Sequence, residues 1–150
     1  MKAVLDTNVW LDWLLFDDPS VAGIRQAAEG ARLRVLAWPR ARDELADVLS
    51  RPAVLAQATR SRARRGFAPP DPAHALVEFD RVAIPCEAPP PCGLACRDTD
   101  DQGFIDLAVA QHADWLFTKD RALLDLARTA QRRFGLRIVR PAGFVADPDL

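Results

Sequence analysis

Two short apolar runs, far apart in the chain, each lead into a carboxylate. Ala3-Val4-Leu5 precedes Asp6, and Trp115-Leu116-Phe117 precedes Thr118-Lys119-Asp120. Runs of this length are too short for helices and are typical of buried strands in parallel sheets. Because open α/β sheets place ligand sites at the carboxyl ends of their strands, we expect Asp6 and Asp120 to meet at one edge of a sheet. Two carboxylates that lie side by side need a metal ion, a shared proton or a cationic partner to offset their repulsion.

The other segments alternate between strand-like and helix-like patterns. Further strands are expected at 33–37, 81–84 and 136–139, and helices at 8–16, 20–29, 39–50, 53–65, 72–80, 101–112 and 120–133. The proline-rich residues 85–99 predict an irregular loop. Strands alternating with helices predict a three-layer α/β/α sandwich with a mainly parallel central sheet, as a single domain over residues 1–150.

Composition narrows the protein class without identifying a partner. Hydrophobic residues make up 49 % of the 150 residues, which excludes general disorder, and the net charge of −1 can hide separated patches of opposite sign. The sequence has no signal-peptide pattern and no apolar run of the roughly 18 residues that a membrane span requires. We therefore expect a cytoplasmic protein with no membrane partner.

Three cysteines fall in or beside the proline-rich loop: Cys86, Cys92 and Cys96. A zinc site is one interpretation, but the spacing is not a familiar zinc motif and no histidine is near in sequence. Free thiols, as in a reducing compartment, are the favoured interpretation.

A third carboxylate is expected from the helix at 39–50, which offers Asp43, Glu44 and Asp47. At about 100° per residue, Glu44 lies roughly 40° from Val48 and borders the apolar face of this helix. The two aspartates lie on the far side and are expected in solvent. Glu44 is therefore the candidate.

Four residues compete for a fourth position: Asp98, Asp100, Asp101 and Asp106. Helical geometry places Asp101 on the buried side of the helix at 101–112, and Asp106 about 140° away on the open side. Asp101 also lies in the first turn, where the helix dipole favours an anion. Asp98 is expected to be the N-cap, or an outer ligand that reaches the site through water.

A simpler interpretation exists for both acids at the strand ends. An aspartate that follows a strand is often only the N-cap of the next helix, and this applies to Asp6 and to Asp120. Their matching positions after two strands favour a functional site.

These residues together resemble the PIN domain, the fold of VapC-type toxin ribonucleases. The matching segments are Val4-Leu5-Asp6-Thr7-Asn8, Asp43-Glu44-Leu45, Leu49-Ser50-Arg51-Pro52, Asp98 to Ile105, and Ala113 to Asp120. They occur in the family's order and are spread over residues 1–128. The resemblance is closest to a bacterial subgroup of toxin components, from which Gly103 departs because a larger residue is usual there.

The resemblance implies RNA cleavage that depends on a divalent metal. It assigns Asp6, Glu44, Asp101 and Asp120 as catalytic metal ligands, with Asn8 and Thr118 as polar supports, while Asp106 also has counterparts in the subgroup. Oxygen ligands of this kind suit Mg²⁺ or Mn²⁺. An RNA substrate, a cognate antitoxin and a homodimer are the partners it implies.

Substrate contacts are expected outside the acidic pocket. Arg60, Arg62, Arg64 and Arg65 are candidates for RNA phosphate binding, with a solvated helix face as the alternative interpretation. The four tryptophans are expected in the core or at an interface, and an exposed Trp10 or Trp13 would suit a dimer. His74 and His112 are interpreted as structural or surface residues.

Two other functions compete with a nuclease. A phosphoaspartate phosphatase or receiver would also place acids at strand ends, but Asn8 stands where such phosphatases carry a second aspartate. A PIN-like module that binds RNA or protein without cleavage is the non-enzymatic alternative.

Overall fold

A central sheet in which all neighbouring strands are parallel organises the protein. The computed structural model describes residues 1–144, and within them the strand order is β3-β2-β1-β4-β5. The strands are β1 (Lys2–Leu5), β2 (Arg34–Ala37), β3 (Ala83–Pro85), β4 (Trp115–Phe117) and β5 (Arg137–Val139). The earliest strand is therefore central, with β2 on one side and β4 on the other.

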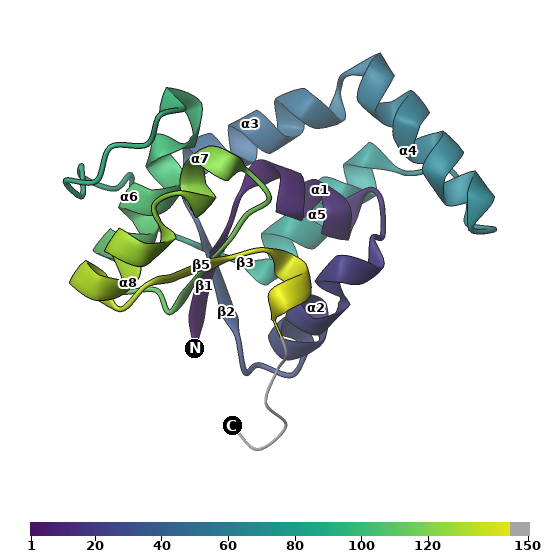
Figure 1. Cartoon of the computed structure of the whole chain (residues 1–150). Helices are drawn as coiled ribbons and strands as arrows, with labels where there is room; N and C mark the ends of the chain where they lie inside the picture. Colours follow the sequence, from purple (N-terminus) through teal and green to yellow (C-terminus); the bar gives the residue numbers. More distant parts are fainter. Residues whose placement is uncertain (145–150) are drawn as a thin grey trace.

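Helices cover both faces of this sheet (Figure 1). In the described part of the chain they are α1 (Thr7–Leu14), α2 (Ala22–Glu29), α3 (Pro39–Leu49), α4 (Pro52–Arg64), α5 (Pro72–Val82), α6 (Gln102–Ala110), α7 (Arg121–Leu124) and α8 (Ala127–Phe134), with 3₁₀ turns η1 (Pro19–Val21), η2 (Thr99–Asp101) and η3 (Pro141–Gly143). A proline begins α3, α4 and α5, where its missing N–H costs nothing and its fixed φ suits the helix. Gly135 ends α8 with a positive φ of 66°.

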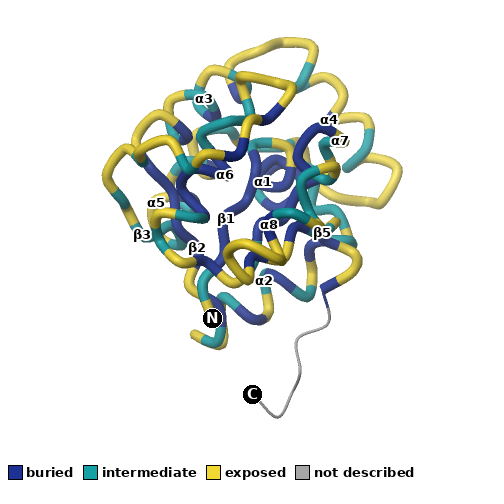
Figure 2. Tube along the Cα trace, turned by 60° about the vertical axis from the view of Figure 1, so that its left-hand side comes forward, coloured by how far each residue is buried: buried dark blue, intermediate teal, exposed yellow. Residues whose placement is uncertain are grey.

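The alternating side chains of the strands supply two separate hydrophobic cores. In β1, Ala3 and Leu5 face the core formed with α1, α2 and α5, whereas Val4 faces the core formed with α6, α7 and α8. This division confirms the predicted three-layer α/β/α sandwich. Figure 2 shows β1 buried in the middle of the molecule, while much of α4 is exposed at the periphery.

The strands β1 and β4 are neighbours, as their matching sequences predict. Leu5 pairs with Phe117, and the Asp6 N–H donates to the Phe117 carbonyl at 3.1 Å. The first residues after both strands therefore lie at the same edge of the sheet. Above this edge, α3 leads into α4, which extends away from the sheet (Figure 1).

One expected helix is wrong, whereas the tryptophans of α1 lie in the core, one of the two places expected for them. The segment expected as one helix at 120–133 forms α7 and α8, because Leu126 N–H bonds to Leu123, three residues back, and interrupts the regular pattern. Trp10 and Trp13 are only 2 % and 5 % exposed, since Trp10 packs on Phe79 of α5 and on Trp13 itself. Neither tryptophan is available to a dimer interface.

None of the helices in residues 1–144 combines the length and the apolar character needed to cross a membrane.

Candidate metal centre

Asp6 is held by hydrogen bonds to both of its carboxylate oxygens. It is 3 % exposed, its Oδ1 accepts from the Val9 N–H at 2.9 Å, and its Oδ2 accepts from the Thr118 hydroxyl. Burial raises the pKa of this carboxyl, and the bonds from Thr118 and Val9 oppose the shift. Asp6 is therefore the N-cap of α1, as the simpler interpretation held, and is also fixed at the sheet edge.

Thr118 connects the ends of β1 and β4. Its hydroxyl donates to Asp6 and accepts from the Asp120 N–H at 2.9 Å, and its side chain is fully buried. Asp120 in turn caps α7, because its Oδ1 accepts from the Ala122 N–H at 2.8 Å. One buried hydroxyl thus sets the relative position of two acids.

A third and a fourth acid reach Asp120 from the turn before α6. Ligand oxygens of Asp98, Asp101 and Asp120 lie within 4.8 Å of one another. Asp98 caps η2 by accepting from the Asp100 N–H at 3.0 Å, as expected, and it also belongs to this cluster. We refer to these three residues as the acidic cluster; Asp6 lies beside it, because the Thr118 hydroxyl bonds to both Asp6 and Asp120.

The buried Asp101 Oδ2 has no hydrogen-bond donor among the described residues. Burial, the hydrogen bond that a protonated Asp101 donates to Asp120, and the neighbouring negative charges raise the pKa of Asp101 to about 8. The same bond lowers the pKa of Asp120. Two carboxyl groups can bond to each other only by sharing a proton or a cation, so the acidic cluster fits a divalent metal ion.

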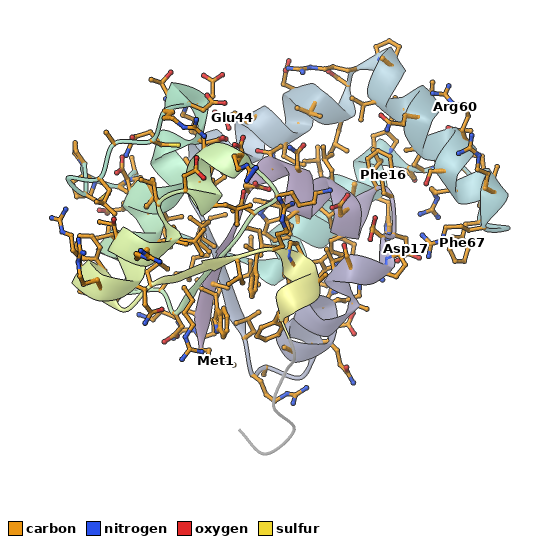
Figure 3. The ribbon with its side chains drawn as sticks, viewed as in Figure 1. Met1, Phe16, Asp17, Glu44, Arg60 and Phe67 are labelled. Carbon is orange, nitrogen blue, oxygen red and sulfur yellow. The ribbon has the colours of Figure 1, made fainter. Side chains whose placement is uncertain are left out.

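Glu44 lies across a hollow from the acidic cluster. It is half-buried on α3, between the apolar face and solvent, and its Oε1 is 3.3 Å from the Arg40 Nε. A cavity of about 500 Å³ is lined by Glu44, Asp101 and the exposed Asn8, among others. Figure 3 shows Glu44 on α3. The structure thus places Glu44 near the cluster without joining it to the three aspartates.

Asp106 is not in solvent, contrary to the helical-wheel prediction. It is 8 % exposed, and its Oδ1 accepts from the Cys92 N–H and from the Gln102 side-chain amide, both at 3.0 Å. The proline-rich loop covers this side of α6, and a helical wheel contains no information about such a loop. Asp106 is not one of the three grouped aspartates and bonds to the loop instead.

Gly103 is explained by its neighbour across the core. A Cβ at this position would lie 2.5 Å from the Trp38 ring carbon Cζ2. The indole therefore occupies the space that a larger residue would need. This contact accounts for the departure from the usual pattern at a position within the first turn of α6.

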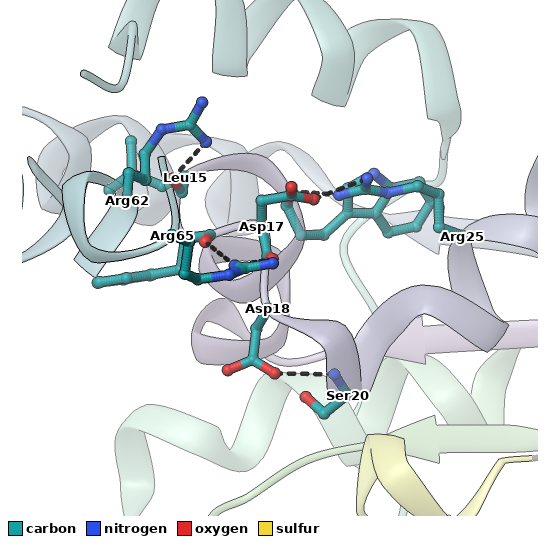
Figure 4. A network of polar contacts seen from close by, with 9 residues as sticks. Leu15, Asp17, Asp18, Ser20, Arg25, Arg62 and Arg65 are labelled. Carbon is teal, nitrogen blue, oxygen red and sulfur yellow. Dashed lines mark hydrogen bonds and ion pairs between the residues drawn. The ribbon is translucent and has the colours of Figure 1, made fainter. Parts of the chain in front are cut away.

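The four candidate arginines of α4 divide into two pairs. Arg62 and Arg65 bond to backbone carbonyls of the segment after α1, including Leu15 and Asp17, and both pack on Phe67 (Figure 4). Arg60 and Arg64 are exposed along a cleft beside α1, and Figure 3 shows Arg60 on the outer part of α4. Arg60 and Arg64 are therefore available in the cleft to bind a ligand, whereas Arg62 and Arg65 bond to the protein's own backbone.

Histidine and cysteine contribute nothing to the metal centre. His74 and His112 are exposed, in agreement with the expectation, and the three cysteines are free thiols. Within residues 1–144 the one group with metal-binding geometry consists of the three aspartates. Sequence reasoning overlooked Asp12, a buried acid within the apolar α1; a lone carboxylate in such a run was the available signal.

The fold and the site define a class: three-layer α/β/α proteins with clustered carboxylates at the carboxyl edge of a parallel sheet. The family model of the PIN domain matches residues 2–122, and the chain belongs to the PIN domain family. This confirms the family that the sequence motifs indicated.

A solved structure shows the same fold. The crystal structure of VapBC2 from Rickettsia felis, bound to a DNA fragment from their promoter, contains a chain that is 14 % identical, with a TM-score of 0.53. The similarity covers 92 % of this chain and 97 % of that chain. No curated protein matches this sequence.

Proposed function

We propose that this protein is a divalent-metal-dependent endoribonuclease that hydrolyses phosphodiester bonds of RNA. The observation that carries the proposal is the buried Asp101 Oδ2 without a donor, at a site where carboxylate oxygens of Asp98, Asp101 and Asp120 lie within 4.8 Å of one another. A cation is the group that such an arrangement lacks. Membership of the PIN domain family supports nuclease activity, because PIN domains are generally nucleases.

The donor set favours Mg²⁺ or Mn²⁺, since all of its atoms are carboxylate oxygens. Asp98, Asp101 and Asp120 would hold the ion, with Asp6 adjacent. Bound there, it supplies Lewis acidity and neutralises charge on the phosphodiester. The Thr118 bonds keep Asp6 and Asp120 in place, so little reorganisation is needed when substrate arrives.

Glu44 is suited to a separate role. It lies across the hollow from the acidic cluster and is paired with the exposed Arg40, so its carboxylate can orient the attacking water or receive its proton. Arg60 and Arg64, in the adjoining cleft, would bind RNA phosphates on the cleft side of the cleavage site.

The phosphoaspartate alternative has little support. A nucleophilic aspartate needs an accessible oxygen, and both oxygens of the buried Asp6 are occupied by Val9 and Thr118. A non-cleaving PIN-like module has the same fold and is distinguished from the nuclease by the assay below.

A toxin–antitoxin role extends this proposal. The similar Rickettsia felis chain belongs to a complex named VapBC2 that is bound to promoter DNA. We infer that this chain likewise acts in the cytoplasm as the toxin of a pair and binds an antitoxin. A homodimer has less support than an antitoxin partner, because Trp10 and Trp13 are buried.

An RNA cleavage assay with and without Mn²⁺ tests the nuclease proposal. The parent protein should cut a structured RNA in millimolar Mn²⁺ and should stop in excess chelator. Asp6→Asn should be inactive yet folded, because asparagine keeps the shape and removes the charge. Asp80→Asn, at an exposed ion pair with Arg42, is the control and should remain active. Full activity in chelator would exclude the metal-dependent mechanism, and a parent protein without activity under any condition would favour the binding module.

A further inference from the structure

Asp12 is a buried carboxylate outside the acidic cluster. It lies on α1, is 6 % exposed, and its Oδ2 is 2.5 Å from the Lys119 Nζ. The contact is an ion pair without hydrogen-bond alignment, and no other donor reaches this oxygen among the described residues. Burial raises the pKa of Asp12, and the Lys119 ammonium opposes the shift. Lys119 is therefore the cation that compensates a buried negative charge.

Lys119 occupies a position that touches two parts of the molecule. Its backbone lies between Thr118 and Asp120, at the metal centre, while its side chain reaches α1 and remains 42 % exposed. Burial raises the pKa of Asp6, and the Lys119 charge is one of the groups that oppose this shift. The ammonium is thus close enough to Asp6 to act on it, although it is paired with Asp12.

The exposed side of Lys119 faces the cleft beside α1 that Arg60 and Arg64 of α4 also line. This cleft has a volume of about 870 Å³ and is also lined by Arg51, Arg60 and Arg64. It adjoins the hollow of the acidic cluster, because Asn8, Val48 and Arg51 line both. Among the cations of the cleft, Lys119 is the one whose charge acts on Asp6. It stands where a bound strand would pass from the metal centre into the cleft.

From this geometry, and resting on the proposed function, we propose that Lys119 binds the RNA phosphate next to the scissile one, on the side of the cleft. Asp12 acts as a positioning residue that holds the ammonium on that side. A lysine is a compact charge on a flexible stem and suits a single phosphate. Without Asp12 the ammonium would turn to the neighbouring carboxylates and compete with the metal ion.

The first test removes the ammonium in Lys119→Met. The KM for a single-stranded oligoribonucleotide should rise roughly tenfold, as for loss of a hydrogen bond to a charged group. The slope of log affinity against log salt should decrease by about 0.7, because one phosphate contact is lost. The chain's only other lysine is Lys2, whose Nζ bonds to the Gln111 carbonyl, so Lys2→Met is the matched control and should keep the parental values. An unchanged KM and salt slope in Lys119→Met would overturn the phosphate contact.

The second test isolates the positioning role. In Asp12→Asn the released ammonium should raise the Mn²⁺ concentration needed for half of the melting-temperature increase severalfold. The double variant Asp12→Asn/Lys119→Met should restore the parental Mn²⁺ midpoint and retain the high KM. It also removes both charges of the buried pair, so it should fold even if a single variant does not. An unchanged Mn²⁺ midpoint in Asp12→Asn, or a double variant that resembles it, would overturn the positioning role.

Failure of this inference differs from failure of the proposed function. A parent protein that cleaves in Mn²⁺ while both variants match it would contradict the role of Lys119 alone. If the parent does not cleave, the salt slope of oligoribonucleotide binding, read by fluorescence anisotropy, and the Mn²⁺ melting midpoint still test Lys119 and Asp12.

Discussion

Two acids from one helical segment have opposite surroundings. Asp106 is 8 % exposed, and its Oδ1 receives bonds from the Cys92 N–H and the Gln102 amide. Asp101, at the start of α6, is half-buried, and its Oδ2 is buried without a donor. The more buried residue is thus the one whose carboxylate accepts two hydrogen bonds, both at Oδ1. Burial alone does not identify a functional acid; a buried oxygen without a donor is the better indicator.

The largest expected difference between the two acids is in catalysis. Asp101→Asn should reduce Mn²⁺-dependent RNA cleavage by about a hundredfold or more, because even groups that only orient metal ligands contribute about 10- to 100-fold. Asp106→Asn keeps the Oδ1 acceptor and should retain most of the activity. Initial rates at saturating Mn²⁺ measure both. The reverse result would assign the ligand role to Asp106 and break the comparison.

Metal binding should also stabilise the fold through the acidic cluster. At 100 times its dissociation constant, an ion that binds only the native state adds about 2.7 kcal/mol, or roughly 5–10 °C in melting temperature for a chain of this size. Asp120→Asn should lose this increase and still cap α7, since asparagine is also a good N-cap. Asp71→Asn at the N-cap of α5 is the matched control and should keep the increase. A parent protein that melts at the same temperature with and without Mn²⁺ would argue against a preformed site.

A smaller effect is expected from removing the structural acid. Asp106→Ala leaves the Cys92 N–H and one Gln102 donor without an acceptor, and an unsatisfied buried group costs about 1–3 kcal/mol. The urea midpoint should decrease accordingly while the cleavage rate of the folded protein stays close to parental. Loss of cleavage at unchanged stability would show that Asp106 acts in the site and not in the loop.

Local sequence patterns were sufficient to predict which acids lie at the carboxyl edge of the sheet. The two short apolar runs and the acids that follow them predicted that Asp6 and Asp120 meet beside β1 and β4, and Thr118 joins them. The apolar face of α3 predicted the half-buried position of Glu44. In these cases the deciding contacts lie within one element or between neighbouring strands. Their catalytic roles stay predictions.

Contacts between distant segments explain the failures. Asp106 is covered by the loop that contains Cys92, so its burial cannot be read from the helix itself. No proline or glycine lies at the break between α7 and α8, so no local signal in the sequence predicts it. The Asp12–Lys119 pair joins residues more than one hundred positions apart, and no local pattern links them.

The smallest expected effect concerns the proton that Asp101 holds in place of a cation. Its pKa is raised to about 8 in the folded protein, from an ordinary value of 3.8, so its stabilising contribution is complete below about pH 4 and is lost as the pH rises toward 8. Asp120 has a lowered pKa, and its contribution to stability changes only in acid, below the window of pH 5 to 8.5.

In chelator, the melting temperature of the parent should therefore fall by a few degrees across this window. Asp101→Asn should show a smaller fall, because burial also raises the pKa of Asp6 and Asp12 and part of the dependence stays. Saturating Mn²⁺ should flatten the parental curve, since the ion replaces the shared proton. Parallel curves for parent and Asp101→Asn in chelator would mean that Asp101 holds no such proton, and the contrast with Asp106, whose Oδ1 accepts two hydrogen bonds, would then rest on geometry alone.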